Sequence, residues 1–447
     1  MGLSHRLFEG CPMKFLNYQK SIPIVDYFDV IVVGSGPAGV CAAVSAARQG
    51  MKVALVERYG VLGGNLTAGH VGPILGMVSK GTMRDELVSL LGVPQNDMIG
   101  RVGVAHDTEQ AKIVLTNFVH AENNIIVFLQ TVVFDVVMKE TVIKGIIVST
   151  KEGMKVLMGQ VIIDASGDGD VASLAGASWK KGRDDGLMQP VTLEFTLTNV
   201  DESKAIVCIG DVDDVTFDGM RFLDYCKHCA DKGELPAQLA AVRLHRTTRS
   251  GERRVNTTQM NYIDSTQTAD LFKAEVELRD QIPIVTDFLR SHLPGYEKCV
   301  VSSSGTTLGV RESRRIIGEY VLTRDDVVFG RRFPDVVVHK AEFIVDIHNP
   351  NGAGQAEQKI QYCNPYDIPY GCFIPKEIDG LYLAGRCISG THEAHASYRV
   401  MSICMAMGEA VGIASSLCVQ KKTSPKNLDV VVLQQKLEEK GIDLFSK

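Results

Sequence analysis

Hydrophobic residues near the start of the chain fall into two short runs separated by a stretch with helical spacing. Residues 29–33 (DVIVV) form an unbroken, mostly β-branched run, which predicts a buried strand. An alanine-rich stretch at 37–49 predicts a helix that ends before Gly50, and residues 52–56 (KVALV) predict a second strand that ends at Glu57. A strand, a helix and a strand in this order predict a β-α-β unit with parallel strands.

The turn between the first strand and the helix has the spacing GxGxxG. The first glycine allows a tight turn, the second lets the backbone approach a pyrophosphate, and the third lets the helix pack close to the strand. The start of the helix directs free N–H groups and a positive dipole end at the phosphates. The acid after the second strand is placed to accept a hydrogen bond from an adenosine ribose hydroxyl. An acid at this position argues against a 2′-phosphate and so disfavours NADP. The alternative is an ordinary β-α-β unit whose glycines only form a turn. The predicted dinucleotide-binding residues are Gly34, Ser35, Gly36, Pro37, Ala38, Gly39, Glu57 and Arg58.

Further along the chain the pattern predicts more strands and then a change of character. Apolar runs at 125–130, 131–140, 144–153 and 154–166 predict a β-meander that returns to one more core strand at Val161–Ala165. From about residue 190 the chain mixes strands, acidic loops, amphipathic helices and many arginines, which predicts a substrate domain inserted into a nucleotide-binding domain. The expected division is an N-terminal extension at 1–27, nucleotide-binding parts at 28–189 and 340–420, a substrate domain at 190–339 and a tail at 421–447.

Composition narrows the class of protein. The chain has 447 residues, of which 45% are hydrophobic, and this is enough for two or three domains with sizeable cores. Its net charge is −6 without long runs of one sign, so we expect neither nucleic acid nor an anionic membrane as a partner. The eleven cysteines are odd in number and scattered, which indicates reduced thiols in a cytoplasmic protein. The apolar stretch Val400–Val419 is interrupted by Glu409, so it predicts a buried helix and not a membrane span. The sequence leaves open whether the protein forms an oligomer.

Five sequence blocks together resemble one family. They are the β-α-β unit and the segments Val61–Gly69 (VLGGNLTAG), Ile163–Asp170 (IDASGDGD), Thr307–Gly318 (TLGVRESRRIIG) and Leu381–Ser389 (LYLAGRCIS). The chain resembles FAD-dependent oxidoreductases of the glutathione-reductase structural type, and more narrowly the bacterial family named FAD-dependent oxidoreductase. The resemblance implies an α/β fold, with a Rossmann-like FAD-binding domain (a parallel sheet plus a β-meander) and an inserted mixed α+β substrate domain. It also implies that FAD is bound extended and non-covalently, with the isoalloxazine between the two domains.

Small residues in these blocks let the backbone approach such a cofactor. In the glycine loop, N–H groups and small polar side chains can reach the flavin or the diphosphate without a Cβ in the way, although a plain surface loop is the alternative. A helix is predicted at about 397–407, after the Leu381–Ser389 block, and the resemblance implies that its dipole stabilises the anionic reduced flavin. Many relatives carry an acid where this chain has Arg386, which could pair with the pyrophosphate. The resemblance implies FAD contacts from Gly63, Gly64, Asn65, Thr67, Val133, Ala165, Ser166, Gly167, Gly385, Arg386, Val400 and Met401.

The cysteines argue against thiol chemistry. Disulfide reductases of the resembled type have a Cys-x4-Cys pair just after the glycine loop, and the corresponding residues 64–70 contain no cysteine. The only CxxC pair, Cys226 and Cys229, falls on a predicted helix without a second pair at zinc-like spacing, so structural thiols are favoured over a redox or metal site. Cys387 lies near the predicted flavin, but a buried small hydrophobe is the favoured interpretation.

The candidates for catalysis follow the last of the five blocks. His392 and His395 are three residues apart and share a face of a predicted helix, where a neutral imidazole suits general acid–base work. The alternative, that both histidines only pack around the flavin, stays open, and no metal site is expected. Arg399 could hold the flavin or a substrate carboxylate. Arg246 and Arg311 are candidate substrate ligands, with the segment that starts at Arg311 predicted to open an amphipathic helix, although internal salt bridges are the alternative.

These expectations define one main function and two alternatives. The main hypothesis is an FAD-dependent oxidoreductase that transfers a hydride between flavin N5 and a small organic substrate, anionic or polyhydroxylated. NAD(P)H stays open as a transient electron donor. The alternatives are a flavin monooxygenase and an FAD-binding electron-transfer component without its own small-molecule substrate. Covalent attachment of the flavin through His70 is not favoured, because the motif around this residue differs from that of histidine-linked relatives.

Overall fold

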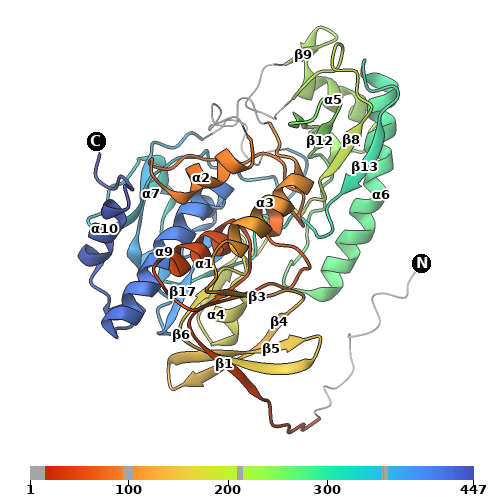
Figure 1. Cartoon of the computed structure of the whole chain (residues 1–447). Helices are drawn as coiled ribbons and strands as arrows, with labels where there is room; N and C mark the ends of the chain where they lie inside the picture. Colours follow the sequence, from red (N-terminus) through yellow and green to blue (C-terminus); the bar gives the residue numbers. More distant parts are fainter. Residues whose placement is uncertain (1–15, 94–103, 209–214, 355, 357–360, 447) are drawn as a thin grey trace.

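A computed structural model of the chain describes residues 16–93, 104–208, 215–354, 356 and 361–446 (Figure 1). Its main sheet has the strand order β3-β2-β1-β6-β5-β4, and β17 pairs with β6. The apolar runs form the fully buried centre of this sheet, as expected for parallel strands covered on both faces. The α/β fold expected from the sequence is confirmed. The strands of this sheet are β1 (Ile24–Val33), β2 (Val53–Val56), β3 (Ile125–Phe128), β4 (Val132–Lys139), β5 (Val142–Thr150), β6 (Gly153–Asp164) and β17 (Leu381–Leu383).

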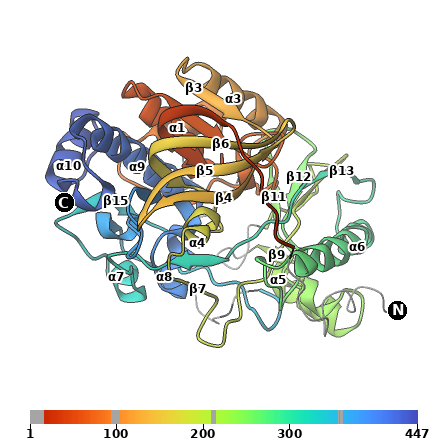
Figure 2. The same ribbon diagram turned by 90° about the horizontal axis from the view of Figure 1, so that it is seen from below.

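The strand β6 belongs to two structures at once. Its second half is parallel to β1 and β17, whereas its first half is antiparallel to β5 and completes the predicted meander with β4. The meander therefore continues directly into the core strand that the sequence placed at Val161–Ala165. Because β6 extends so far, it also pairs with residues 24–28, so β1 begins at Ile24 and the expected N-terminal extension ends earlier than residue 27. Figure 2 shows β6, β5 and β4 side by side, with α1 (Pro37–Arg48) on one side of them and α4 (Asp170–Leu174) on the other.

Helix α9 (Met401–Lys421) packs along α1 at a distance that only small residues allow. A Cβ at Gly408 would lie 2.0 Å from the carbonyl oxygen of Ala38, and one at Gly412 would lie 2.4 Å from that of Ala42. By length and composition α9 resembles a membrane span, but 94% of its apolar window is buried inside the protein, as the sequence predicted. The other helices and small sheets around this core are α2 (Met83–Leu90), α3 (Thr108–His120), α7 (Arg324–Val328), α8 (His392–Tyr398), α10 (Val430–Glu439), β7 (Trp179–Lys181) with β14 (Arg314–Ile316), and β15 (Val336–Ala341) with β16 (Tyr366–Pro369).

A second hydrophobic core contains residues between Val191 and Leu308, while the first core resumes at Ile316. The first core thus resumes before the domain boundary expected at 339. This inserted module, green in Figure 1, is a four-stranded antiparallel sheet of order β11-β12-β8-β13 with two helices. The module consists of β8 (Phe195–Thr198), β9 (Thr216–Phe217), β10 (Met220–Arg221), α5 (Phe222–Asp231), β11 (Leu244–Arg246), β12 (Arg253–Val255), α6 (Thr268–His292) and β13 (Val300–Ser304).

Two local predictions are wrong. The segment after Arg311 forms the strand β14 instead of an amphipathic helix, because it pairs with β7 and buries Arg315 beside Glu312. The helix expected at 397–407 is interrupted: α8 ends at Tyr398 and α9 begins at Met401. Short 3-10 turns occur at Gly64–Leu66, Ala237–Leu239, Tyr370–Phe373, Gly385–Cys387 and Pro425–Asn427.

The contact between α1 and α9 predicts the effect of a single added methyl group. We expect Gly408→Ala to lower the free energy of unfolding by about 1–3 kcal/mol, because the methyl group overlaps backbone that cannot move alone. In an unconstrained helix a change from glycine to alanine raises the free energy of unfolding by about 1 kcal/mol. The sign of the change therefore shows whether the two helices approach as closely as described. Urea unfolding measures it, with Lys421→Ala at the exposed end of α9 as the control. A Gly408→Ala variant as stable as the parent would contradict the close approach.

Candidate cofactor and substrate site

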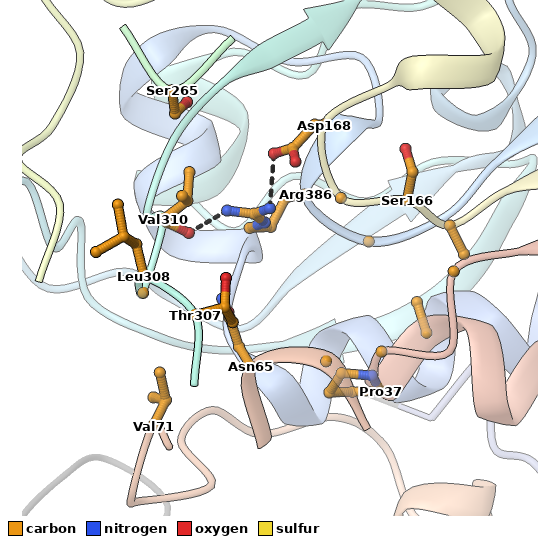
Figure 3. A pocket seen from close by; sticks show the side chains of 18 of the residues that line it. Pro37, Asn65, Val71, Ser166, Asp168, Ser265, Thr307, Leu308, Val310 and Arg386 are labelled. Carbon is orange, nitrogen blue, oxygen red and sulfur yellow. Dashed lines mark hydrogen bonds and ion pairs between the residues drawn. The ribbon is translucent and has the colours of Figure 1, made fainter. Parts of the chain in front are cut away.

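A cavity of about 790 Å³ lies between the two cores and is lined by residues of both. Its volume is within the range of ligand and cofactor sites, roughly 300–1,000 Å³. Figure 3 shows this cavity, with Pro37 and Asn65 on one side and Leu308 and Val310 of the connection to the inserted module on the other. The predicted residues that line it are Gly34, Gly36, Pro37, Ala38, Glu57, Arg58, Gly64, Asn65, Val133, Ala165, Ser166, Gly167, Gly385, Arg386, Val400, Met401, Arg311 and Arg399.

The turn between β1 and α1 is built as the glycine spacing predicts. Gly34 has φ +92°, and a Cβ there would lie 2.4 Å from the carbonyl oxygen of Ala165 on the neighbouring strand. A Cβ at Gly39 would lie 1.8 Å from the carbonyl oxygen of Gly34. Gly36 is different, because a Cβ there would meet nothing within 4 Å and would extend into open space. Two glycines thus close the strand–helix contact, and the third leaves room for a ligand at the start of α1.

Glu57 is held in position from the same turn. Its Oε2 accepts hydrogen bonds from the backbone N–H (2.8 Å) and the hydroxyl (2.6 Å) of Ser35, and its Oε1 accepts one from the backbone N–H of Tyr59 (2.8 Å). The carboxylate is 3% exposed yet lines the cavity, so its remaining lone pairs face a bound molecule. Ser35 therefore orients Glu57 from behind, without lining the cavity itself.

The glycine loop contributes Gly64 and Asn65 to the lining, while three further predicted residues shape the site from outside it. The N–H of Gly63 (φ +110°) donates to the carbonyl of Ser35 at 2.8 Å, and the hydroxyl of Thr67 donates to the carbonyl of Leu62. Gly39 lies within the strand–helix contact described above. The loop is thus fixed against the β1–α1 turn instead of being a plain surface loop.

Arg386 forms an ion pair with a buried carboxylate. Its Nη2 lies 2.9 Å from Oδ1 of Asp168, and its Nη1 donates to the carbonyl of Val310 (Figure 3). A Cβ at Gly167 would lie 2.6 Å from this guanidinium, so the glycine gives the arginine room. Burial acts to raise the pKa of Asp168, but Arg386 and Arg58 outweigh it and hold this pKa below its usual value. The pair is an ordered polar wall of the cavity.

A second polar group lines the cavity on the side of the inserted module. Arg399 donates to the carboxylate of Asp346 at 2.8 Å, and Nε2 of His348 lies 3.4 Å from the same carboxylate. Arg311 donates to the carbonyl of Pro190 at 2.8 Å and to the side chain of Asn256 at 3.3 Å. Arg311 is only 8% exposed, and among the described residues it forms no ion pair. It is thus a buried cation without a direct anionic partner, which is costly unless a ligand supplies one.

The pKa values in this group follow from burial and from neighbouring cations. Burial and Arg399 lower the pKa of Arg311 to about 9. Burial and Arg311 lower the pKa of His348 to about 3, so the imidazole is neutral at pH 7. Burial acts to raise the pKa of Asp346, but His348 and Arg399 outweigh it and lower this pKa below its usual value. Burial raises the pKa of Glu194, another lining residue, to about 7. On this side of the cavity two arginines, Arg311 and Arg399, thus lie near one carboxylate with a lowered pKa, Asp346, and one with a raised pKa, Glu194.

The structure does not bring the two predicted catalytic histidines to the cavity. Outside the cavity lining, Nδ1 of His392 donates to the carboxylate of Glu312 at 2.9 Å. His395 is fully buried without a hydrogen-bond partner among the described residues. Both histidines lie on α8, which is enclosed by other elements. Arg246 is also displaced, because its side chain is 58% exposed at the end of β11 and lies 4.0 Å from Glu202. Of the predicted catalytic and substrate residues, Arg311 and Arg399 line the cavity.

Sequence reasoning missed the residues that accompany these two arginines. Glu194, Asn256 and the pair Asp346 and His348 come from three separate parts of the chain and meet only in the folded protein. A local signal existed for one pair, since an acid and a histidine at alternate positions (Asp346, His348) share a face of an extended segment. No local pattern indicated Glu194, which lies in an apolar strand-like run.

The remaining predicted polar side chains have structural surroundings. His70 contacts the hydroxyl of Thr196 at 2.8 Å, and its pKa is lowered to about 2, mainly by burial. Cys387 is fully buried against backbone carbonyls, and burial raises its pKa well above the usual value. Cys226 and Cys229 lie on α5 as predicted, with free thiols.

A dinucleotide fits the first part of this cavity on structural grounds. Open space adjoins Gly36 at the start of α1, a carboxylate oriented by Ser35 stands at the end of β2, and α9 begins at the cavity with Val400 as its N-cap. Helix starts of this kind bind phosphate and stabilise developing negative charge. The chain belongs to the family of FAD dependent oxidoreductases, whose sequence model matches residues 29–437. FAD is the cofactor of this family and therefore of this chain.

Individual relatives share shorter stretches with the chain. A soluble pyridine nucleotide transhydrogenase of Chromohalobacter salexigens is 42% identical over 79 residues, which are 18% of this chain and 16% of that protein. A thiamine thiazole synthase of Methanococcus aeolicus is 29% identical over 171 residues, 36% of this chain and 62% of that protein. A solved structure from Thermoplasma acidophilum, described as geranylgeranyl bacteriochlorophyll reductase-like, aligns over 93% of this chain and 84% of that one, with a TM-score of 0.48 and 14% identity.

The position of Glu57 predicts its contribution to FAD affinity. We expect Glu57→Gln to raise the dissociation constant for FAD roughly 10- to 100-fold, because a hydrogen bond to a charged acceptor contributes about 1.5–3 kcal/mol. Titration of the FAD-free protein with FAD, followed by flavin fluorescence, measures the change. The control is Glu152→Gln at the exposed turn between β5 and β6, which should bind FAD as the parent does. Equal affinities for both variants would remove Glu57 from the cofactor site.

Proposed function

We propose that the cavity binds FAD extended and non-covalently, as in glutathione-reductase-type flavoproteins, and that the enzyme oxidises or reduces a small carboxylate substrate beside it. The predicted FAD contacts that line the cavity extend from Glu57 past Gly36 to Met401. This path leaves the polar group around Arg311 and Arg399 for the substrate. When bound, FAD supplies the hydride acceptor or donor.

The single observation that carries the substrate class is the charge of Arg311. Its guanidinium is buried, lines the cavity and has only neutral hydrogen-bond partners among the described residues, Pro190 and Asn256. The second cation, Arg399, is bound to Asp346 on one edge. A carboxylate supplies the missing charge and accepts two N–H groups from one guanidinium. This favours an anionic substrate over the polyhydroxylated one.

We assign the role of general base, which accepts the substrate proton, to His348 instead of His392 or His395. The Nε2–H of His348 faces the carboxylate of Asp346, which holds the ring in one tautomer. Its Nδ1 then carries a free lone pair; this atom is buried and has no hydrogen-bond partner among the described residues, so the imidazole has to turn toward the cavity to meet a substrate. Burial and the charge of Arg311 lower the pKa of this imidazole. Once a substrate carboxylate offsets that charge, His348 accepts a proton from a substrate hydroxyl or amine, and the Asp346 carboxylate stabilises the imidazolium that forms.

This arrangement also bears on the alternatives. An electron-transfer component without a substrate has no use for a buried cation without an ion-pair partner and a neighbouring histidine on one wall of the cavity. A monooxygenase differs in its electron source, because NAD(P)H rather than the organic substrate must reduce the flavin. The electron source is therefore what the test has to measure.

The first test is anaerobic reduction of the purified yellow protein. We expect flavin bleaching by members of a panel of hydroxy and amino acids, and none by the matching alcohols, amines or amides, because only the acids pair with Arg311. Arg311→Met should raise the KM of the active acid roughly 10- to 100-fold, the value of a lost charge-assisted hydrogen bond.

The control for this test is Arg246→Met, which changes the exposed arginine at the end of β11 and should leave the KM unaltered. Bleaching by NAD(P)H alone, followed by oxygen consumption only when an organic compound is present, would replace the proposal with a monooxygenase. Bleaching by neutral and anionic compounds alike would remove the carboxylate requirement.

The base assignment makes a prediction that separates His348 from His392. We expect His348→Asn to lower the rate of flavin reduction by roughly 10²–10⁴-fold with little change in substrate affinity. His392→Asn, outside the cavity lining, should keep the parent rate. Since the pKa of His348 is lowered to about 3, its imidazole stays unprotonated down to that pH, and the parent rate should not fall between pH 8 and pH 5 through this residue. Rapid mixing across pH measures both effects; a slow His392→Asn variant with a normal His348→Asn variant would reverse the assignment.

A further inference from the structure

Three potential metal ligands converge at the end of the inserted module that is far from the β1–α1 turn. Cys229 lies in the last turns of α5, Glu234 in the loop that follows α5, and His292 is the last residue of α6. One ligand atom of each residue lies within 4.8 Å of the other two. In Figure 1, α5 is at the top of the view, well separated from α1 and β1. The proposed oxidoreductase chemistry uses none of these three residues.

The separations match those of a tetrahedral zinc site. With Zn–N and Zn–O bonds of about 2.0–2.2 Å and tetrahedral angles, nitrogen and oxygen ligands lie about 3.3–3.5 Å apart. The Nε2 of His292 and Oε2 of Glu234 are 3.3 Å apart in the structure. The sulfur of a zinc-bound cysteine lies about 3.6 Å from the other ligands, given a Zn–S bond of about 2.3 Å. Because the sulfur of Cys229 already lies within 4.8 Å of the other two ligand atoms, zinc binding requires at most a short movement of the Cys229 side chain.

The histidine is prepared for this role by its other nitrogen. Nδ1 of His292 donates to the backbone carbonyl of Phe288 at 3.0 Å, and the ring stacks on Phe288 with 4.5 Å between the centroids. In the neutral imidazole this tautomer leaves the lone pair on Nε2, which faces the Glu234 carboxylate. Two acceptors then face each other, and a proton or a cation has to lie between them. A backbone carbonyl that fixes the tautomer is the usual support of a zinc-bound histidine.

The other two ligands are fixed from the second core. Cys229 is 2% exposed, and its thiol interacts with Glu234 and with the hydroxyl of Tyr225. The N–H of Glu234 donates to the carbonyl of Cys229 at 3.0 Å, which returns the loop to the helix that carries the cysteine. The positive charge of Lys232 lies near the three ligands and repels a metal cation, but Lys232 is exposed, so solvent screens this repulsion. A buried sulfur, an imidazole and a carboxylate form the ligand set that zinc prefers.

We propose that Cys229, Glu234 and His292 form a Zn²⁺ site of the inserted module, with water as the fourth ligand. On binding, the S–H bond of Cys229 breaks, its proton leaves to solvent and a Zn–S bond forms; no oxidation state changes. Any proton held between His292 and Glu234 leaves in the same way. The ion joins the end of α5 to the end of α6, whose opposite end contributes Leu271 and Glu275 to the cavity. It stabilises the module and takes no part in the redox chemistry.

The experiment uses the FAD-loaded enzyme, freed of metal with a chelator and titrated with Co²⁺. We expect one Co²⁺ per chain, with the visible bands of a tetrahedral ion at wavelengths longer than the flavin bands and a sulfur-to-cobalt band in the near ultraviolet. Added Zn²⁺ should abolish both signals and raise the Tm of the parent protein, because it binds the folded state alone. Cys229→Ser should lose the sulfur band, and Glu234→Gln should weaken binding at least tenfold.

The matched control is His228→Asn, which removes an exposed histidine from α5 next to Cys229 but outside the cluster. It should keep the parent spectrum and the rise in Tm. The Cys229→Ser variant changes a buried residue and could misfold, so Glu234→Gln serves as a second variant because Glu234 lies in an exposed loop. An unchanged FAD content shows that the variant is folded. Co²⁺ binding without the sulfur band, no binding at all, or equal losses in Glu234→Gln and His228→Asn would each overturn the site. None of these results depends on the substrate, so they leave the proposed function unaffected.

Discussion

The rest of the structure depends on the close approach of backbone to backbone where β1 turns into α1. Gly34 lies against Ala165 of the strand-end segment after β6, and Gly39 lies against Gly34, with no space for a Cβ at either glycine. This contact sets the position of α1, and the contact of Gly408 with Ala38 then sets α9 against α1. Both helices consequently begin at the same cavity. Because the first turn of a helix has N–H groups without intrahelical partners, this geometry gives the cavity two anion-binding corners.

The polar residues of the cavity fall into two groups with different charge balance. Around Arg386, the cation is matched by Asp168 at 2.9 Å, and the pair completes the wall without a ligand. Around Arg311 the balance is incomplete, because Asp346 is shared by Arg399 and His348 while Arg311 has neutral partners. Burying an unmatched cation costs free energy, and a protein keeps such a residue where a ligand offsets the cost. The imbalance is the basis on which we propose an anionic substrate on this side of the cavity.

The inserted module has its own core, and it joins the cavity through a few segments of chain. Thr307 to Arg311 connect it to the first core, and the start of α6 adds Leu271 and Glu275 to the lining. Such a module can change its surface residues without disturbing the β1–α1 contact, since the two cores share few positions. The cavity is thus lined both by the nucleotide-binding part of the chain and by the inserted module.

The sequence by itself determined the nucleotide-binding half of this protein. The β-branched runs, the glycine spacing and Glu57 are close in the chain, so the local pattern contains the whole of that geometry. The apolar runs further along the chain likewise predicted the meander and the buried helix α9. Only the tertiary structure decided the substrate wall. Glu194, Asn256, Arg311, Asp346 and His348 meet there from distant segments, and whether a histidine such as His392 faces the cavity or is enclosed depends on how its helix packs. Local periodicity describes which face of an element is buried, whereas the partner that buries it is fixed only by contacts between elements far apart in the chain.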